Sequence, residues 1–229
     1  MKSITTILLI LFIGFTTNAQ YDCSKFYPFT EGAKSQLTLY NGKNKVQGMV
    51  EYEVLKLSTT GGSVSATMKN RLFDEKGSML SESEYEALCS DGVVSIDFKS
   101  LMRPGLMDAY GNMETEVTGT NLDLPNDLEV GQSLPDAEIN VKMSMSGMNM
   151  NMKTAIVDRK VIGRESITTP AGTFDCFVLT QTMEIKSIAS NMSRTSKQWV
   201  AEGVGVVKTE DYNKKGKLDG VSLLTAFNK

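Results

Sequence analysis

Residues 73–79, FDEKGSM, carry the turn chemistry on which the fold depends. Asp74 begins a type I turn, and Gly77, three positions later, accepts the left-handed backbone conformation that ends a bulged hairpin loop. An aromatic residue precedes this turn and an apolar residue follows it. Residues 212–218, YNKKGKL, repeat the chemistry, and residues 40–46, YNGKNKV, repeat it with Asn44 in the left-handed position. Hairpins in series predict an antiparallel meander.

Residues 81–89, SESEYEALC, show the alternation of a strand with one apolar face. The three glutamates share one face, and Tyr85, Ala87 and Cys89 share the other. Like charges on neighbouring positions repel one another and prefer water, so we expect the acidic face to be solvated. The apolar face would then contribute to the core.

Similar alternation recurs through the chain, and no helical period is sustained over three turns. The clearest predicted strands are residues 37–40, 49–57, 64–73, 93–98, 174–185 and 204–212. Residues 102–135 contain three prolines and are predicted to be irregular, forming a flap or a short helix over the sheet. The predicted class is all-β with minor α, in one antiparallel sheet built from successive hairpins.

The first residues have the features of a secretory signal peptide. Lys2 is followed by an apolar run at residues 4–15 and by the small residues Thr17 and Ala19, which predicts cleavage after residue 19. The apolar run is shorter than the roughly 20 residues of a membrane helix, so no transmembrane segment is expected after cleavage. No cysteine follows Ala19 directly, which disfavours lipoprotein processing. We therefore expect a periplasmic or secreted protein.

Residues 20–229 are predicted to form a single antiparallel β domain, since no linker or low-complexity run divides them. The formal net charge of −3 is mild and spread along the chain. Nucleic acid and anionic membrane surfaces would require a concentrated basic patch, so both are poor partners.

The chain contains three cysteines, and an oxidising compartment would favour one disulfide and one free thiol. Cys176 lies in an apolar strand-like run, where a buried inert thiol is common. Elimination therefore favours a bond between Cys23 and Cys89, although the residues alone leave all three pairings open.

Residues 141–153, VKMSMSGMNMNMK, contain five methionines. In one unbroken strand they would point to both faces, but a two-residue turn or a bulge at residues 146–147 would bring them to one face. In the hairpin case Met145 opposes Met148 and Met143 opposes Met150. Such a set could be plain core packing, a pliable wall for an apolar ligand, or a Cu(I) site made of thioethers. Its members are Met143, Met145, Met148, Met150 and Met152.

The sequence lacks the residues of several common kinds of chemistry. It contains no histidine, which excludes Ser-His-Asp and Cys-His machinery and histidine-based zinc sites. No closely spaced cysteine pair and no phosphate-loop spacing is present. We therefore predict a protein that is not an enzyme and has no catalytic residue, cofactor or metal ligand set.

Residues 161–176, VIGRESITTPAGTFDC, predict two strands joined by a turn at residues 169–172. This stretch resembles a signature of the TapB-like family of secreted bacterial envelope proteins of unknown function. Further matches surround Cys23, Cys89, residues 128–131, Trp199 and residues 203–207. The resemblance implies a curved antiparallel sheet, a half-barrel or open barrel similar to those of lipoprotein carriers. It also supports pairing of Cys23 with Cys89 and transfers no catalytic residue.

These observations lead to three functional hypotheses. The first is an envelope protein that binds a lipid or another apolar ligand in the concave face of its sheet, with the five methionines and Trp199 among the lining candidates. The second is a structural or accessory protein that has a filled core and works through protein partners. The third is Cu(I) binding by the methionines.

Overall fold

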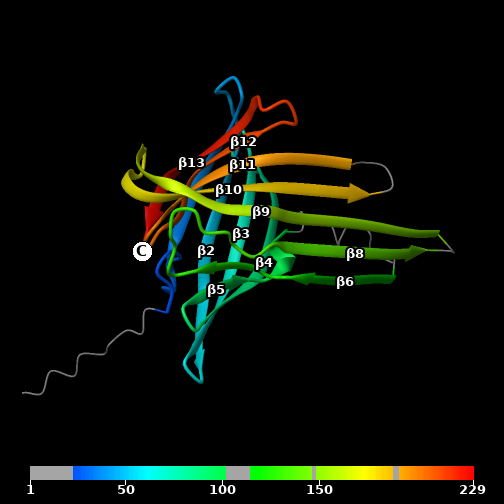
Figure 1. The fold of residues 1–229 in the computed structure, drawn as a ribbon, viewed down its shortest axis with the longest axis horizontal. Helices are drawn as coiled ribbons and strands as arrows, with labels where there is room; N and C mark the ends of the chain where they lie inside the picture. The colour runs from blue at the N-terminus through cyan, green and yellow to red at the C-terminus, as the bar shows by residue number, and fades with distance from the viewer. Residues whose placement is uncertain (1–22, 102–113, 146–147, 188–190) are drawn as a thin grey trace, which may run out of the picture.

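The computed structural model describes residues 23–101, 114–145, 148–187 and 191–229; the predicted signal peptide lies outside them. Within these ranges thirteen strands form one nearly closed, barrel-like sheet (Figure 1), and the only helical element is a 3-10 turn, η1 (Phe98–Leu101). The all-β prediction is confirmed. In chain order the strands are β1 (Lys34–Asn41), β2 (Val46–Thr60), β3 (Ser63–Asp74), β4 (Met79–Ser90), β5 (Val93–Ile96), β6 (Glu114–Thr120), β7 (Leu122–Pro125), β8 (Ala137–Met145), β9 (Met148–Thr169), β10 (Gly172–Ser187), β11 (Asn191–Ala201), β12 (Gly205–Tyr212) and β13 (Leu218–Asn228).

The sheet consists of two runs of consecutive antiparallel strands, β8 to β13 and β1 to β5, which the pairing of β13 with β1 joins. Its strand order is β6-β8-β9-β10-β11-β12-β13-β1-β2-β3-β4-β5-β7, so most neighbours are also consecutive in sequence. Strands β6, β8, β9 and β10 run across the view in Figure 1, whereas β2 and β3 cross behind them in a steep direction. In the part of the chain that the structure describes, no helix has the length and apolar character needed to span a membrane.

The three repeated turns have one geometry. In the second and third turns Asp74 and Asn213 each accept two backbone N–H bonds, and Gly77 (φ 83°) and Gly216 (φ 70°) take the left-handed conformation. In the first turn Asn44 has a φ of 59°, as its position in the motif predicted. Local side-chain bonding and positive φ thus determine where these hairpins turn.

The two edge strands of the sheet are neighbours in sequence. Among the described residues strand β6 pairs only with β8 and β7 only with β5, and Asn121 separates β6 from β7 in the sequence. Asn121 accepts a hydrogen bond from the backbone N–H of Phe98 and donates one to Ser95, so its amide fixes this junction. The chain itself therefore closes the ring at this point.

Residues 102–135 are only partly irregular. Residues 102–113 lie outside the described residues, residues 114–125 form β6 and β7, and an irregular segment follows. Proline lacks a backbone N–H, but Pro125 is tolerated at the end of β7 because an edge strand has a neighbour on one side only. In β6, an added Cβ at Gly119 would lie 2.3 Å from the Glu138 carbonyl oxygen and 2.8 Å from the Phe98 ring, so glycine permits this close packing.

A buried arginine joins β9 to the far edge of the sheet. Arg159 is 4% exposed, and its Nη1 donates to the carbonyl oxygens of Asp123 in β7 and of Pro135. These bonds satisfy one carbonyl on the edge strand β7 and one in the segment that leads into β8. We call this junction of β7, β9 and residues 126–136 the seam.

Exposed and buried side chains alternate along the strands, as the pleat of a sheet requires. On β4 the three glutamates are exposed, whereas Ala87 and Cys89 are buried. On β3 Lys69 and Arg71 point outward and form ion pairs with these acidic side chains, including a 2.9 Å contact from Arg71 to Glu82. The predicted solvated acidic face is confirmed.

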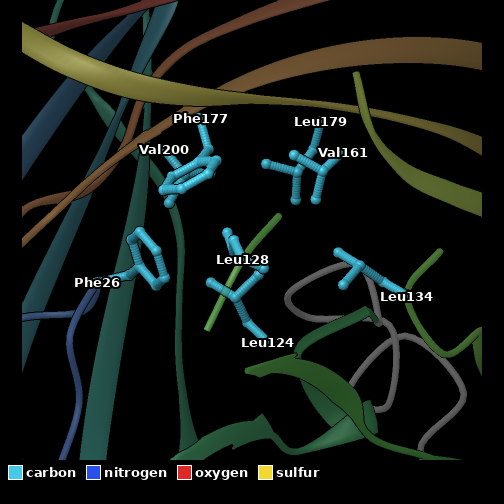
Figure 2. Close-up of a cluster of buried hydrophobic side chains, with 8 residues drawn as sticks. All are labelled: Phe26, Leu124, Leu128, Leu134, Val161, Phe177, Leu179 and Val200. Carbon is cyan, nitrogen blue, oxygen red and sulfur yellow. The ribbon is translucent and has the colours of Figure 1, made fainter. Parts of the chain in front are cut away.

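The largest core cluster fills one part of the barrel (Figure 2). Phe26 from the N-terminal segment meets Phe177 of β10 edge to face, with ring centroids 5.9 Å apart. Residues from the seam segment pack onto this pair. The buried members of the cluster are Phe26, Leu124, Leu128, Leu134, Val161, Phe177, Leu179 and Val200.

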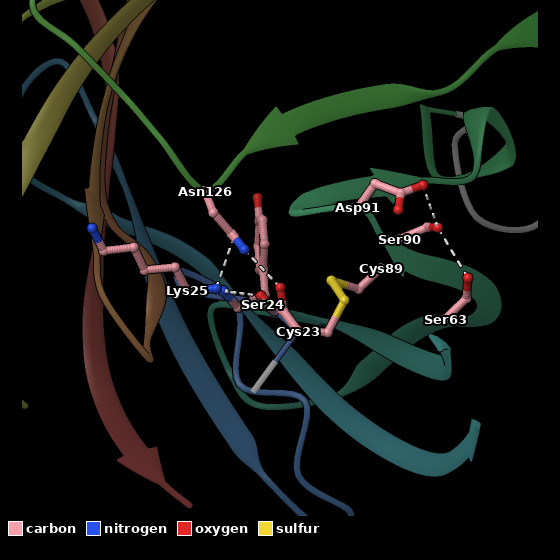
Figure 3. The surroundings of a disulfide bond; sticks show 9 residues. Cys23, Ser24, Lys25, Ser63, Cys89, Ser90, Asp91 and Asn126 are labelled. Carbon is pink, nitrogen blue, oxygen red and sulfur yellow. Dashed lines mark hydrogen bonds between the residues drawn. A yellow bond between two sulfur atoms is a disulfide. The ribbon is translucent and has the colours of Figure 1, made fainter. Parts of the chain in front are cut away.

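One disulfide ties the N-terminal segment to the barrel wall (Figure 3). Cys23 bonds Cys89 of β4, and Cys176 is a buried free thiol. The side chain of Asn126 clamps the same segment, because it donates to the Cys23 carbonyl and accepts from the Lys25 N–H. Since the segment also supplies Phe26 to the core, its attachment holds the filled end of the barrel in place.

Candidate functional site

A cavity of about 370 Å³ lies inside the curved sheet. Its walls come from strands all around the ring and from the N-terminal segment, so the fold as a whole creates it. Most of the lining is apolar, with side chains such as Leu37, Val50, Val54, Met68, Ile96 and Val206. We call this space the interior cavity.

Strand alternation explains which residues reach the interior cavity. On β2 the even-numbered Val50, Tyr52 and Val54 line it, and these positions face the same side of the sheet. Tyr27 and Val206 line the cavity and also pack against the large core cluster. The cluster therefore forms one end of the cavity.

Polar side chains are interspersed among the apolar residues of the lining. Three tyrosines, Tyr27, Tyr52 and Tyr85, line the cavity. Asn70 and Gln181 line it as well, and Asn70 lies directly opposite Tyr52 in the β2–β3 ladder. An apolar space with a small number of polar groups is the usual composition of a small-molecule site.

Burial alters the titration of the three tyrosines. It raises the pKa of Tyr27 to about 12 against a smaller opposing effect of Arg159, and it raises the pKa of Tyr52 and Tyr85 as well. The side chains nevertheless keep some accessible surface, as expected for groups that face an internal space. All three hydroxyls therefore remain protonated and able to donate at neutral pH.

The methionines of the β8–β9 hairpin lie apart from the interior cavity. Met143 pairs with Met150, and Met145 pairs with Met148, at the far end of β8 and β9. Met143 is 4% exposed and packs with Val141, Met150 and Met152 in a separate cluster. The side chains of Met145 and Met148 lie outside the described part of the structure. None of the described methionine side chains in this hairpin borders the interior cavity.

A second hollow lies beside this hairpin. Met143 and Met150 border it together with Glu116 and Lys142, which form an ion pair at 3.2 Å. Its polar rim differs from the apolar lining of the interior cavity. This hollow is separate from the interior cavity, and of the two spaces the described methionines of the hairpin contact only the hollow.

Trp199 is buried on the opposite face from the cavity. Its strand neighbour Gln198 lines the interior cavity, so the pleat directs Trp199 to the other side. The indole N–H donates to Glu165 at 2.8 Å, and Lys208 Nζ lies 4.3 Å from the ring centroid. The structure therefore gives Trp199 a packing environment and not a place in the cavity wall.

The described residues contain no group of three or more histidine, cysteine, aspartate or glutamate side chains arranged to hold a metal ion. Cys176 is also poorly placed for reaction. Burial, followed by nearby Asp175 and Glu165, raises the pKa of its thiol to about 11. At neutral pH it is therefore a protonated, weakly nucleophilic group.

No sequence motif marks the three tyrosines as a group. Tyr85 was placed on the apolar face of its strand, and that alternation was the one available signal. Tyr27 precedes β1, and Tyr52 lies in β2, to which the N-terminal segment is hydrogen-bonded between Gly32 and Val54. Their shared location depends on the register of the consecutive strands β2, β3 and β4, in which Tyr52 lies opposite Asn70 and Tyr85 opposite Met68.

The fold is shared with solved bacterial proteins. A protein of Bacteroides fragilis, described as exported and as having a YmcC-like fold, matches with a TM-score of 0.73 and 22% identity over 90% of this chain and 100% of that chain. A protein of Parabacteroides distasonis, described as a lipoprotein, matches with a TM-score of 0.71 and 27% identity over the same shares of the two chains. A comparison with curated proteins finds no match.

The fold thus places the chain among barrel-like proteins, and the two similar solved proteins are described as exported and as a lipoprotein. The disulfide is consistent with an oxidising compartment. The profile of the DUF3108-like family matches residues 30–224, which is most of the sequence. The chain belongs to this family.

Proposed function

We propose that this protein is a non-enzymatic envelope protein that binds a lipid or another apolar ligand in its interior cavity. The cavity of about 370 Å³ is the observation that carries the proposal. It lies within the range of roughly 300 to 1,000 Å³ that is typical of ligand pockets. Its lining is mainly apolar, so transfer of an acyl chain from water would be favourable.

Several observations support the proposed location. The relatives are described as exported or as lipoproteins, and the sequence predicts a signal peptide over residues 1–19. A periplasmic or secreted destination and a narrower membership in the TapB-like group remain parts of this proposal. We propose the residues that line the interior cavity as the binding residues, in place of the methionine hairpin and Trp199.

The first test is native mass spectrometry of the protein purified from its host envelope, followed by titration with a fluorescent lipid. A bound mass that organic extraction removes is expected. A ligand-free mass without lipid binding would refute the proposal and favour an accessory protein that works through partners.

A pair of variants locates the ligand. Val50→Phe would occupy part of the interior cavity and is expected to reduce lipid binding strongly. Val46→Phe adds the same volume in the same strand, but Val46 is 44% exposed and lies outside the cavity lining. Equal binding by the two variants would place the ligand elsewhere on the protein.

A further inference from the structure

Three hydroxyl groups face the interior cavity without a protein partner. Tyr27, Tyr52 and Tyr85 line the cavity, and none of the side-chain hydrogen bonds found among the described residues involves their hydroxyls. Hydroxyls in an apolar interior normally have a partner, because leaving one unpaired costs free energy. Each of the three side chains keeps some accessible surface, so water or the polar head of a bound ligand can serve as the partner.

The three side chains converge although they come from different elements. Tyr27 belongs to the segment that the disulfide ties down, Tyr52 to β2 and Tyr85 to β4. Each of the three pKa values responds to burial, that of Tyr27 also to Tyr52, and that of Tyr85 to both of the others. The hydroxyls therefore lie in one region of the barrel and not at separate ends.

A buried positive charge lies near this region. Arg159 does not line the interior cavity, but it lies beside Val161 and Leu134 of the core cluster on which Tyr27 packs, it opposes the rise in the pKa of Tyr27, and burial lowers the pKa of its own guanidinium. Asp123 and Asp136 also influence it, but neither carboxylate is within ion-pair distance in the described structure. Its Nη1 binds the two carbonyl groups of the seam, whereas its buried Nε has no hydrogen-bond partner. A guanidinium that is desolvated without a contacting carboxylate favours an anion nearby.

We propose that Tyr27, Tyr52 and Tyr85 form a head-group site, and that the ligand is a single-chain amphiphile with a carboxylate head, such as a fatty acid. This inference rests on the proposed function and specifies its ligand. The hydroxyls donate to the carboxylate oxygens, and the field of Arg159 favours the anionic head over a neutral one. The apolar walls formed by residues such as Val50, Met68 and Ile96 surround the acyl chain.

The test uses three probes that share one chain length: dodecanoate, dodecanol and dodecane. Their binding to the delipidated full protein is measured by calorimetry below micelle-forming concentrations. We expect dodecanoate to bind at least about tenfold more tightly than dodecanol, because hydrogen bonds to a charged group are the stronger kind. The same titrations are then made with Tyr52→Phe and Tyr85→Phe, which remove only a hydroxyl.

Each Tyr→Phe variant should weaken dodecanoate binding about tenfold and dodecanol binding about two- to threefold. Tyr40→Phe is the matched control, since Tyr40 lies in β1 but does not line the cavity. Thermal unfolding verifies that the variants fold. Removing an unpaired hydroxyl should leave the unliganded protein at least as stable as before.

The outcomes separate the two proposals. Tight dodecanoate binding that falls in Tyr52→Phe and Tyr85→Phe but not in Tyr40→Phe supports the head-group site. If all three probes bind and the variants do not differ, the head-group site is refuted while apolar ligand binding stands. If no probe binds, both proposals fail.

Discussion

Removal of the disulfide should destabilise the protein by an amount that the chain topology sets. The perturbation is the double variant Cys23→Ala with Cys89→Ala. The bond closes a loop with a sequence separation of 66 residues. The chain-entropy relation for a loop of that length gives a stabilisation of about 4 kcal/mol at room temperature, mostly through restriction of the unfolded chain.

The surroundings of the bond should increase this loss. Cys89 is fully buried and Cys23 nearly so, in a cluster with Val64 and Val94. Replacing two sulfur atoms by hydrogen leaves a small void there, which adds a packing cost of about 1 kcal/mol. The N-terminal segment then remains attached by Asn126, by the hydrogen bond from the Gly203 N–H to the Lys25 carbonyl, and by the contacts of Phe26.

Urea denaturation with and without dithiothreitol provides the assay. The oxidised wild-type protein should lose about 4 kcal/mol on reduction. The double variant should not respond to the reductant, and Cys176→Ala should respond as the wild type does because Cys176 is a free thiol. A double variant with wild-type stability, or one that still responds to dithiothreitol, would refute the reasoning.

Three further predictions concern single sites. Asn126→Ala removes the two hydrogen bonds to the N-terminal segment and should lower the free energy of unfolding by about 1 to 3 kcal/mol in urea titrations; an unchanged midpoint would contradict the clamp. Burial raises the pKa of the Cys176 thiol from 9.0 to about 11, so between these pH values the thiol ionises more readily in the unfolded chain and the free energy of unfolding falls. Cys176→Ala should therefore reduce the loss of stability that denaturation at stepped alkaline pH measures. If wild type and variant decline equally, the thiol does not contribute. Because Met143 is packed in a core cluster, we expect Met150→Leu to leave the result of an anaerobic Cu(I) titration unchanged. A weakened Cu(I) affinity in that variant would favour the copper hypothesis.

Much of the fold was predictable because its signals are local. The left-handed positions of Asn44, Gly77 and Gly216 follow from side-chain chemistry within each turn. The alternation on β4 also acts over a few residues, so the separation of its glutamates from Ala87 and Cys89 could be predicted. The sequence did not predict the edge strands β6 and β7. Pro125 and Gly119 are typical of turns. Pro125 fits a strand because β7 is at the sheet edge, and Gly119 fits one because it allows close contact with the Phe98 ring.

The candidate site was less accessible to sequence reasoning. The methionine pattern correctly indicated neighbours across a hairpin, in which Met143 faces Met150. It contained no information on how far that hairpin lies from the centre of the barrel. The tyrosines of the interior cavity carry no motif, since each is an ordinary aromatic residue in its own segment.

The sequence by itself determined the turns, the strand alternation, the β class and the residues available for chemistry, because these depend on interactions within a few positions. Only the tertiary structure decided that Cys23 bonds Cys89, that Arg159 joins the seam, and that Tyr27, Tyr52 and Tyr85 surround one space. The physical reason is the closure of the sheet. Most strand pairs are consecutive hairpins, but the ring also requires the pairing of β13 with β1, from opposite ends of the described chain, and no local pattern encodes the volume that the sheet then surrounds.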